Sequence, residues 1–213
     1  MAGDALPRKV GRPADADAAE TRRRLLREAR RCFATAGYDA TPNREIAASV
    51  GITTAAIYHY FDSKADLYVA TYAEVQEMVF STLERATSRH DRFADRFAAL
   101  LDALAEIDAE DPYLAGFVIG VASDLRRHPE LTDAIREHRV RGRDYLLSLC
   151  RDAIARGEVS PAVTESAMYD MLVVMLSGIT RFSYSVHDRE RLLAVTEGLK
   201  QVVAGTILQP ALR

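Results

Sequence analysis

The chain has 213 residues and a formal net charge of −3, with 28 lysines and arginines against 31 aspartates and glutamates. This length supports one or two domains with a sizeable core, and the slightly acidic balance argues against a general nucleic-acid coat. No apolar run is long enough to span a bilayer, and no apolar stretch follows the basic N-terminal residues, so we expect neither a membrane span nor a secretory signal.

The charge is unevenly distributed along the chain. Residues 1–65 carry 11 lysines and arginines against 8 acidic residues, whereas the remainder carries 17 against 23. A basic N-terminal third on an acidic body favours a localised phosphate-binding surface. Residues 1–16 are small, polar and charged, and we expect a disordered basic arm there. Its Gly11-Arg12-Pro13 is typical of segments that place an arginine in an A·T-rich minor groove, although a solvated tail fits the same residues.

The first periodic segment predicts a helix over residues 18–36. Gly37 is expected to end it, because glycine is the usual residue after a helix C-terminus. Thr41 followed by Pro42 predicts the start of a second helix, with the threonine as its N-cap. Gly51 then permits a left-handed turn that a side chain would resist. The residues expected in the core of this unit are Leu25, Leu26, Ala29, Cys32, Phe33, Ile46, Ala47 and Val50.

A short helix after this turn completes a helix-turn-helix pattern. Its inner face is expected to hold Ile57 and Phe61, with Ala56 and Tyr60 beside them. Its outer face carries a hydroxyl, a methyl and two flat polar rings, which are groups that fit the base edges in a major groove. Those residues are Thr54, Ala55, Tyr58 and His59. Arg44, near the start of the preceding helix, has a guanidinium suited to a guanine edge.

The segment from Thr41 to Leu67 resembles the DNA-binding domain of the TetR family of bacterial transcriptional regulators. The resemblance rests on Gly37-Tyr38, Ile46-Ala47, the run from Ile57 to Phe61, Ser63-Lys64 and Leu67. It implies that the positions reading bases are Arg44, Thr54, Ala55, Tyr58 and His59. It implies that the positions holding phosphates are Thr41, Thr53, Tyr60 and Lys64, the last of which also sits at a helix N-terminus that attracts anions.

The rest of the chain has a helical pattern throughout, so the predicted fold class is all-α. We expect a helix-turn-helix DNA-binding domain over residues 17–63 and a helical effector-binding and dimerisation domain over residues 64–213. Prolines, Gly157 and His187-Asp188 mark the breaks between helices. The expected helices span residues 64–88, 91–109, 112–127, 130–156, 161–186 and 189–208.

No catalytic motif is recognisable in this body, so we expect no enzyme activity, no catalytic residue and no cofactor. The five histidines are scattered, and no metal site is expected; a site built from His128 and His138 is the alternative. Cys32 and Cys150 match no metal-ligand spacing, and we expect two buried thiols in a reducing cytoplasm rather than a disulfide.

The resemblance implies that the body binds a small molecule. Stripes of aromatic residues, aliphatic residues and methionine suggest an apolar, aromatic lining and a lipophilic effector. The same stripes also fit a plain hydrophobic core. The candidate lining residues are Phe93, Phe97, Leu101, Leu104, Phe117, Val121, Tyr145, Leu149, Met168, Met171 and Met175.

The resemblance also implies a homodimer formed by the last two helices. Small residues on the penultimate helix would let a partner helix approach closely, and the last helix has more apolar surface than one side needs. The candidate interface residues are Val174, Ser177, Gly178, Arg181, Leu192, Val195, Leu199 and Val202. A dimer would present two recognition helices to a palindromic operator.

Together these features predict a cytoplasmic, homodimeric, ligand-responsive transcriptional regulator. Its expected partners are an operator in double-stranded DNA and a small lipophilic effector, and no membrane is involved. The expected mode is a repressor that the effector releases from DNA. An activator or an effector-independent DNA-binding protein is the alternative. An all-α enzyme with an incidental helix-turn-helix, or a helical adaptor that binds only protein, explains the sequence less completely.

Overall fold

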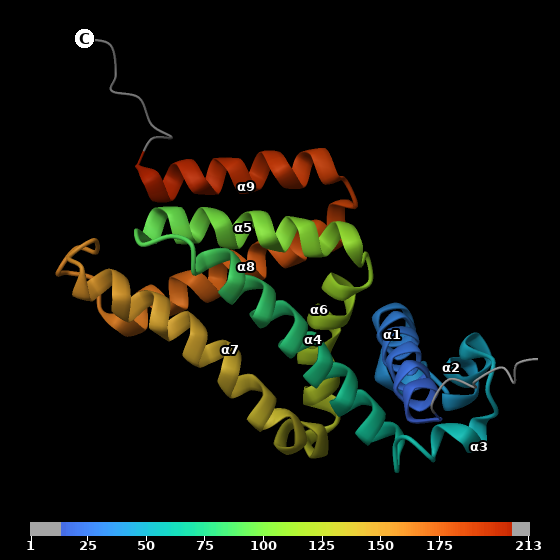
Figure 1. Cartoon of the computed structure of the whole chain (residues 1–213). Coiled ribbons are helices and arrows are strands. Elements are labelled where there is room, and N and C mark those ends of the chain that lie inside the picture. Colours follow the sequence, from blue (N-terminus) through green and yellow to red (C-terminus); the bar gives the residue numbers. More distant parts are fainter. Residues whose placement is uncertain (1–13, 206–213) are drawn as a thin grey trace, which may run out of the picture.

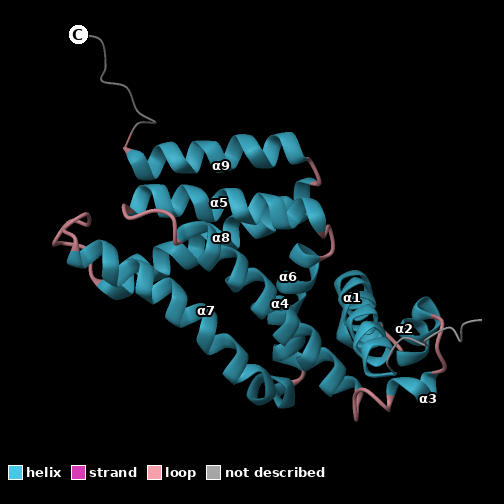
Figure 2. Ribbon diagram, in the orientation of Figure 1, coloured by secondary structure: helices cyan, strands magenta, loops and turns pink. Residues whose placement is uncertain are grey.

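The computed structural model describes residues 14–205. Over these residues the chain folds into nine α-helices and no strand, which confirms the predicted all-α class (Figure 2). The helices are α1 (Ala14–Ala40), α2 (Asn43–Val50), α3 (Thr54–Ile57), α4 (Lys64–Thr87), α5 (Phe93–Glu110), α6 (Leu114–Arg127), α7 (Pro129–Ala155), α8 (Glu165–Val186) and α9 (Arg189–Ala204).

The helices α1, α2 and α3 gather at one end of the molecule, and α4 leads from them into the body (Figure 1). Within the body, α4 packs against α5 and α7, and α5 packs against α9. The helix α8 contacts α6, α7 and α9, while α1 packs along α6. The helix-turn-helix therefore connects to the body both through the chain, at α4, and through the α1–α6 contact.

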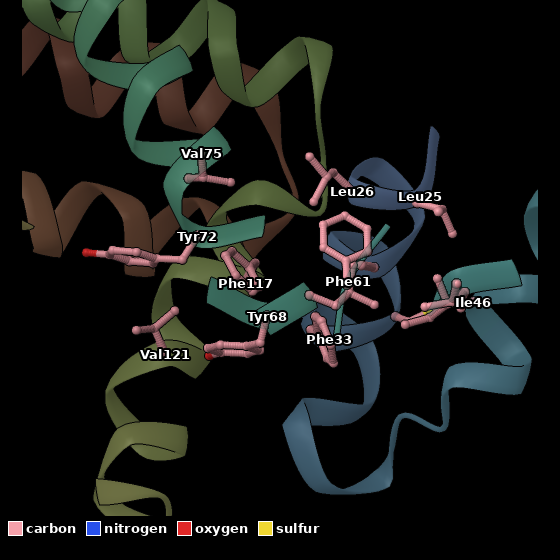
Figure 3. Close-up of a cluster of buried hydrophobic side chains, with 14 of the residues drawn as sticks. Leu25, Leu26, Phe33, Ile46, Phe61, Tyr68, Tyr72, Val75, Phe117 and Val121 are labelled. Atoms are coloured by element: carbon pink, nitrogen blue, oxygen red, sulfur yellow. The ribbon is translucent and has the colours of Figure 1, made fainter. Parts of the chain in front are cut away.

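One hydrophobic cluster joins the N-terminal helices to the body (Figure 3). Phe33 of α1 lies edge-on to Tyr68 of α4, with ring centroids 5.0 Å apart, and Tyr68 lies 5.5 Å from Phe117 of α6. Leu131 and Ile135 of α7 belong to the same cluster. The core of the N-terminal unit thus extends across the predicted boundary at residue 64, so a movement of α4, α6 or α7 has a packed route to α1.

A second cluster fills the far half of the body between α4, α5, α7, α8 and α9. Its fully buried members include Leu100, Leu101 and Cys150. Both cysteines are buried free thiols, as predicted, and burial raises the pKa of Cys150 to about 11. Among the described residues, no helix is long and apolar enough to cross a membrane.

The first helix is longer than the sequence pattern predicted. It begins at Ala14, inside the segment predicted as an arm, because the stretch from Ala14 to Ala19 is rich in alanine, the strongest helix former. At the other end Gly37 adopts φ 79° and ψ 173°, so the helical geometry is interrupted where the glycine was expected to end it, and helical structure then resumes as far as Ala40. The remaining arm, including Gly11-Arg12-Pro13, lies outside the described residues.

The other helix boundaries differ from the predicted ones by up to four residues. The helix α8 begins at Glu165 rather than at residue 161, because the hydroxyl of Thr164 accepts a hydrogen bond from the Ala167 backbone N–H and caps the helix there. The helix α9 ends at Ala204, where Gly205 adopts the left-handed φ of 72°. The predicted end at residue 208 lies outside the described residues.

Candidate DNA-binding surface

The turn between α2 and α3 is built around Gly51. This residue has φ 78° and ψ 30°, the left-handed conformation that glycine accepts without strain, and its N–H caps the C-terminus of α2. The carbonyl of Val50, left free at that helix end, accepts a hydrogen bond of 2.8 Å from the Arg24 guanidinium of α1. Arg24 thereby fixes the end of α2 relative to α1.

The helix α3 is a single turn that continues into a tight turn over residues 58–60. Thr53 caps it, with its hydroxyl accepting a hydrogen bond of 3.2 Å from the Ala56 N–H. Ile57 is fully buried and Phe61 is 5% exposed, which confirms the predicted inner face. Burial of these two residues leaves the opposite side of α3 facing away from the core.

The residues predicted to read bases lie together on this outer side. Ala55, Tyr58 and His59 are exposed, Thr54 is half-buried, and Arg44 is exposed on α2. Tyr58 is 52% exposed, which leaves its ring accessible.

Asn43 is a further member of this surface that the sequence did not identify. Its side-chain N–H₂ lies 3.4 Å from the Tyr58 hydroxyl, so the first residue of α2 and the exposed ring of the α3 turn are neighbours. The Asn43 carboxamide oxygen is buried and has no hydrogen-bond partner. Because this oxygen is buried, only the side-chain N–H₂ of Asn43 belongs to the outer surface. In the sequence, its position directly after Thr41-Pro42 looked only like the first turn of a helix.

The structure gives Thr41 a structural role instead of the predicted helix cap and open phosphate site. Its side chain is fully buried, and its hydroxyl lies 2.8 Å from the Gly37 carbonyl and 3.2 Å from the Cys32 carbonyl. It therefore closes the end of α1, and Pro42 occupies the N-cap position of α2 without a side-chain hydrogen bond. Tyr60 is half-buried against the core, beside Ile57 as expected.

Lys64, also predicted to hold a phosphate, is the first residue of α4. Its ammonium donates to the Asp39 carbonyl at 3.2 Å and lies 4.6 Å from the centre of the Tyr38 ring. Burial lowers the pKa of Lys64, and the nearby Asp39 and Asp124 carboxylates partly offset that effect. Lys64 thus ties the start of α4 to the end of α1.

Two buried polar contacts lie where the N-terminal unit meets the body. Tyr68 of α4 donates to Asp124 of α6 at 3.0 Å. Arg30 of α1, only 7% exposed, pairs with Asp111 at 2.5 Å and lies 3.6 Å from Glu74 of α4. At the surface, His128 links the start of α7 to Asp39 at 2.7 Å. These contacts set the orientation of the helix-turn-helix relative to α4, α6 and α7.

The predicted pocket residues do not come together around one cavity. Phe117 and Val121 belong to the cluster around α1, whereas Phe97, Leu101, Tyr145, Leu149 and Met168 belong to the second cluster. Phe93, Leu104 and Met175 are half-buried against that second cluster. Met171 is 56% exposed on the outside of α8. Most of these side chains fill the hydrophobic core, because packing partners from neighbouring helices occupy the space that a cavity would need.

The predicted dimer residues divide by exposure. Val174, Ser177, Gly178 and Arg181 share one exposed face of α8, and Val202 is exposed on α9. Leu192 is 2% exposed in the core of the same chain, so it is unavailable to a partner, and Leu199 is half-buried there. Val195 is half-buried. Leu193, the next residue of α9, is 42% exposed and is therefore accessible to a partner.

No group of three histidine, cysteine or acidic side chains suited to a metal ion occurs within residues 14–205. His128 is instead hydrogen-bonded to Asp39 and Glu130, at 2.7 and 3.1 Å. Burial would lower the pKa of His128, but these hydrogen bonds raise it above the usual value. His128 therefore has two carboxylate partners, and its hydrogen bond to Asp39 links the start of α7 to the end of α1.

The fold and the outer face of α2 and α3 define a helix-turn-helix DNA-binding protein. The family model described as "Bacterial regulatory proteins, tetR family" matches residues 25–71. Residues 25–71 are thus similar to the DNA-binding domain of TetR-type regulators.

Curated relatives match nearly the whole chain. The transcriptional regulator UidR of Escherichia coli is 22% identical over 90% of this chain and 95% of its own length. The transcriptional repressor Rv1474c of Mycobacterium tuberculosis is 28% identical, over 84% of this chain and 90% of its own length. These relatives are transcriptional regulators.

Solved structures share the fold. The transcriptional regulator FadR of Bacillus subtilis, solved in complex with stearoyl-CoA, superposes with a TM-score of 0.74 at 19% identity. The alignment covers 87% of this chain and 99% of that one. GusR of Salmonella enterica gives a TM-score of 0.71 at 23% identity, with 94% of this chain and 99% of that one covered. The similarity therefore extends beyond the helix-turn-helix to the arrangement of the body helices.

Proposed function

We propose that this protein is a homodimeric repressor that binds a two-fold-symmetric operator and releases it when a small molecule occupies the body. The outer face of α2 and α3 carries this proposal, because it places Arg44, Thr54, Tyr58 and His59 on one accessible side of a rigid helix-turn-helix. These side chains offer the donors, acceptors and apolar contacts that base edges recognise. The relative Rv1474c is named a repressor, which supports repression rather than activation by this protein.

The proposed partner in the dimer is a second copy packed on α8 and α9. Met171 and Val174 are 56% and 69% exposed, and with Ser177 and Gly178 they form one face of α8. Val202 and Leu193 add exposed apolar surface on α9. A contiguous apolar patch on a globular chain is costly in water, and small residues within it allow helices to approach closely. Two copies joined there would present two recognition surfaces to one operator.

Effector control follows from the position of α4. This helix begins at Lys64, directly after the helix-turn-helix, and continues into the body, where it contacts α5 and α7. A ligand that favours a different position of α4 would change the spacing of the two recognition surfaces. Release requires only that the ligand binds the conformation that cannot bind DNA more tightly than the one that can. A hundredfold loss of operator affinity corresponds to a preference of about 2.7 kcal/mol. The neighbour FadR was solved with a stearoyl-CoA ligand, which supports a ligand site in this body.

The test is operator binding by the Tyr58→Ala variant, with Tyr113→Ala as the matched control. Tyr113 is 43% exposed, like Tyr58, but precedes α6 in the body. Operator affinity is measured by fluorescence anisotropy on a duplex selected from a random library. We expect Tyr58→Ala to lose operator binding with unchanged helicity and melting temperature, while Tyr113→Ala binds normally. Normal binding by Tyr58→Ala would overturn the assignment of this face to DNA.

A further inference from the structure

A groove between α4, α7 and α8 has been given no function so far, although Ser177 of the proposed dimer face also lines it. It has a volume of about 560 Å³, and α4, α7 and α8 each contribute to its walls. Small-molecule sites in proteins typically have volumes of about 300–1,000 Å³. The groove is therefore large enough for a ligand, and its position beside α4 makes it relevant to the helix-turn-helix.

The charged side chains that line this groove all have one sign. Arg136, Arg139 and Arg143 line it from α7, and no aspartate or glutamate contributes to its walls. Their spacing of three and four residues places them on one face of the helix. Arg136 pairs with Asp133 at the surface. Within the described residues, Arg139 and Arg143 have no hydrogen bond or ion pair, so their guanidinium groups are available to an anion.

The remaining walls are mostly apolar and aromatic, with Gln76, Thr132 and Ser177 as their polar members. Tyr72 and Phe80 line the groove from α4, and Tyr169 and Val173 line it from α8. Gly142 lets Phe80 pack directly on the α7 backbone, because a Cβ there would lie 2.4 Å from two atoms of the ring. The groove thus combines the two unpaired guanidinium groups of Arg139 and Arg143 with aromatic and apolar side chains. An arginine binds a carboxylate or phosphate through two parallel hydrogen bonds.

We propose that this groove binds the effector, and that the effector is an amphiphile with an anionic carboxylate or phosphate head and an apolar chain. The head pairs with Arg139 and Arg143, and the chain lies along Tyr72, Phe80 and Val173. This assignment rests on the effector-controlled function proposed above and replaces the purely lipophilic ligand expected from the sequence. It also explains why arginines, and no acidic partners, line a groove with an aromatic wall.

The groove is coupled to the DNA-binding unit through α4. Tyr72 lies one helical turn after Tyr68, whose hydroxyl is bonded to Asp124, and two turns after Lys64, which is tied to the end of α1. A chain inserted along Tyr72 and Phe80 pushes on the α4 wall of the groove. The movement of α4 then reaches α1 through contacts that already exist.

The test is calorimetric titration of the full-length protein with four probes: decyl phosphate, decanoate, decanol and inorganic phosphate. The two amphiphilic anions are kept below the concentration at which they aggregate. We expect both to bind at least about tenfold more tightly than decanol and than inorganic phosphate, because only they use both halves of the groove. Equal binding by decanol would overturn the anionic head, and equal binding by inorganic phosphate would overturn the apolar chain.

Arginine variants test whether the amphiphile binds in this groove. The double variant Arg139→Gln/Arg143→Gln is expected to weaken decyl phosphate binding by about tenfold or more, as the loss of charge-assisted hydrogen bonds implies. Arg89→Gln, which removes an exposed arginine just beyond the end of α4, is the matched control and should bind normally. Unchanged binding by the double variant would overturn the proposal.

A parallel anisotropy measurement on the operator separates this proposal from the function on which it rests. Decyl phosphate binding that requires the arginines but leaves the operator complex intact would uphold the groove as an anionic amphiphile site and contradict effector release. Operator release by decyl phosphate in the wild type, and not in the double variant, would support both. Operator release that survives in the double variant would overturn the groove as the effector site.

Discussion

The Tyr68 hydroxyl of α4 donates a hydrogen bond of 3.0 Å to Asp124 of α6, and both side chains are almost completely buried. The other carboxylate oxygen of Asp124 accepts a hydrogen bond of 2.6 Å from Arg127. Burial and the neighbouring carboxylate raise the pKa of Tyr68 strongly, so the tyrosine stays a neutral donor. The pair joins the helix that follows the DNA-binding unit to the helix that packs along α1.

Removing the Tyr68–Asp124 hydrogen bond should lower the stability of the fold and also change the response of the protein to its effector. In Tyr68→Phe, Asp124 keeps Arg127 but loses a buried donor, and we expect the free energy of unfolding to fall by about 1–3 kcal/mol. Denaturant titration measures the loss. The Thr71→Val variant is a useful control, since its buried hydroxyl bonds only to the Leu67 carbonyl of the same helix.

If the Tyr68–Asp124 pair transmits movement of α4, Tyr68→Phe also changes the effector concentration needed for operator release, whereas Thr71→Val leaves it unchanged. Operator anisotropy during titration with decyl phosphate measures this concentration for each variant. An identical response from Tyr68→Phe and the wild type would show that the pair only stabilises the fold.

The link between His128, Asp39 and Glu130 should depend on pH. Its hydrogen bonds raise the pKa of His128, so the folded state holds the imidazole proton more tightly than the unfolded state does. The stabilisation that these hydrogen bonds give is complete below the unfolded pKa of about 6.5. It is lost as the pH rises through the higher folded pKa. The Tyr38 ring and Arg127 also face this group, at 4.7 Å from the imidazole and 3.6 Å from Asp39 respectively.

Measuring the ring chemical shift of His128 against pH by NMR gives the folded pKa directly. The wild type should lose stability relative to His128→Gln as the pH rises from about 6 to about 8, the range over which a histidine with a raised pKa loses its proton. A titration at or below the usual value would contradict the pairing.

The helix-turn-helix was predictable because its signals are local. Ile46, Ile57 and Phe61 are buried as their spacing predicted, and Gly51 turns the chain as a glycine at that position should. Thr41 was misassigned, because a threonine before a proline looks the same whether its hydroxyl caps the next helix or closes the previous one. The partner carbonyl at Cys32 is nine residues away and has no sequence signature.

The body was less predictable because helical periodicity shows which residues form a stripe and not what the stripe faces. Met168 and Met171 lie three residues apart, yet one is 6% exposed in the core and the other 56% exposed. Leu192 and Leu193 are adjacent, and only their contacts with other helices decide which is buried. The sequence analysis assigned no role to the groove arginines, because the groove exists only where α4 and α8 lie beside α7.

Gly142 makes a sharp test of the packing beside the groove. In Gly142→Ala the new methyl would lie 2.4 Å from Phe80, so the ring must move, and overpacking of this kind costs about 1–3 kcal/mol. Gly120→Ala in α6 is the control, because its new methyl meets only the Asp124 carboxylate, at 4.0 Å. Alanine is the better helix former there, and we expect a neutral effect or a gain of about 0.5–1 kcal/mol. Equal stability changes in the two variants would contradict the close packing of Phe80 on α7.

The proposed dimer face can be tested by introducing a charge. Val174→Arg places a guanidinium on the most exposed large apolar residue of α8, and we expect a monomer by analytical ultracentrifugation at micromolar concentration. Ile154→Arg is the matched control: Ile154 is 39% exposed near the end of α7, away from the proposed interface, and this variant should remain a dimer. If Val174→Arg remained a dimer, the interface would lie elsewhere. If the wild type were a monomer, the proposed dimer would not exist.

The measurement that tests the central claim most directly is selection of DNA from a random library by the full-length protein at about 150 mM salt, where general phosphate attraction is weakened. Sequencing of the bound duplexes should reveal one motif with two-fold symmetry, whose half-sites lie about one helical turn, roughly 34–36 Å, or a multiple of it apart. The Tyr58→Ala variant should enrich no motif. Bound duplexes without a shared motif for the wild type, or the same motif for Tyr58→Ala, would contradict sequence-specific recognition by this face of the helix-turn-helix.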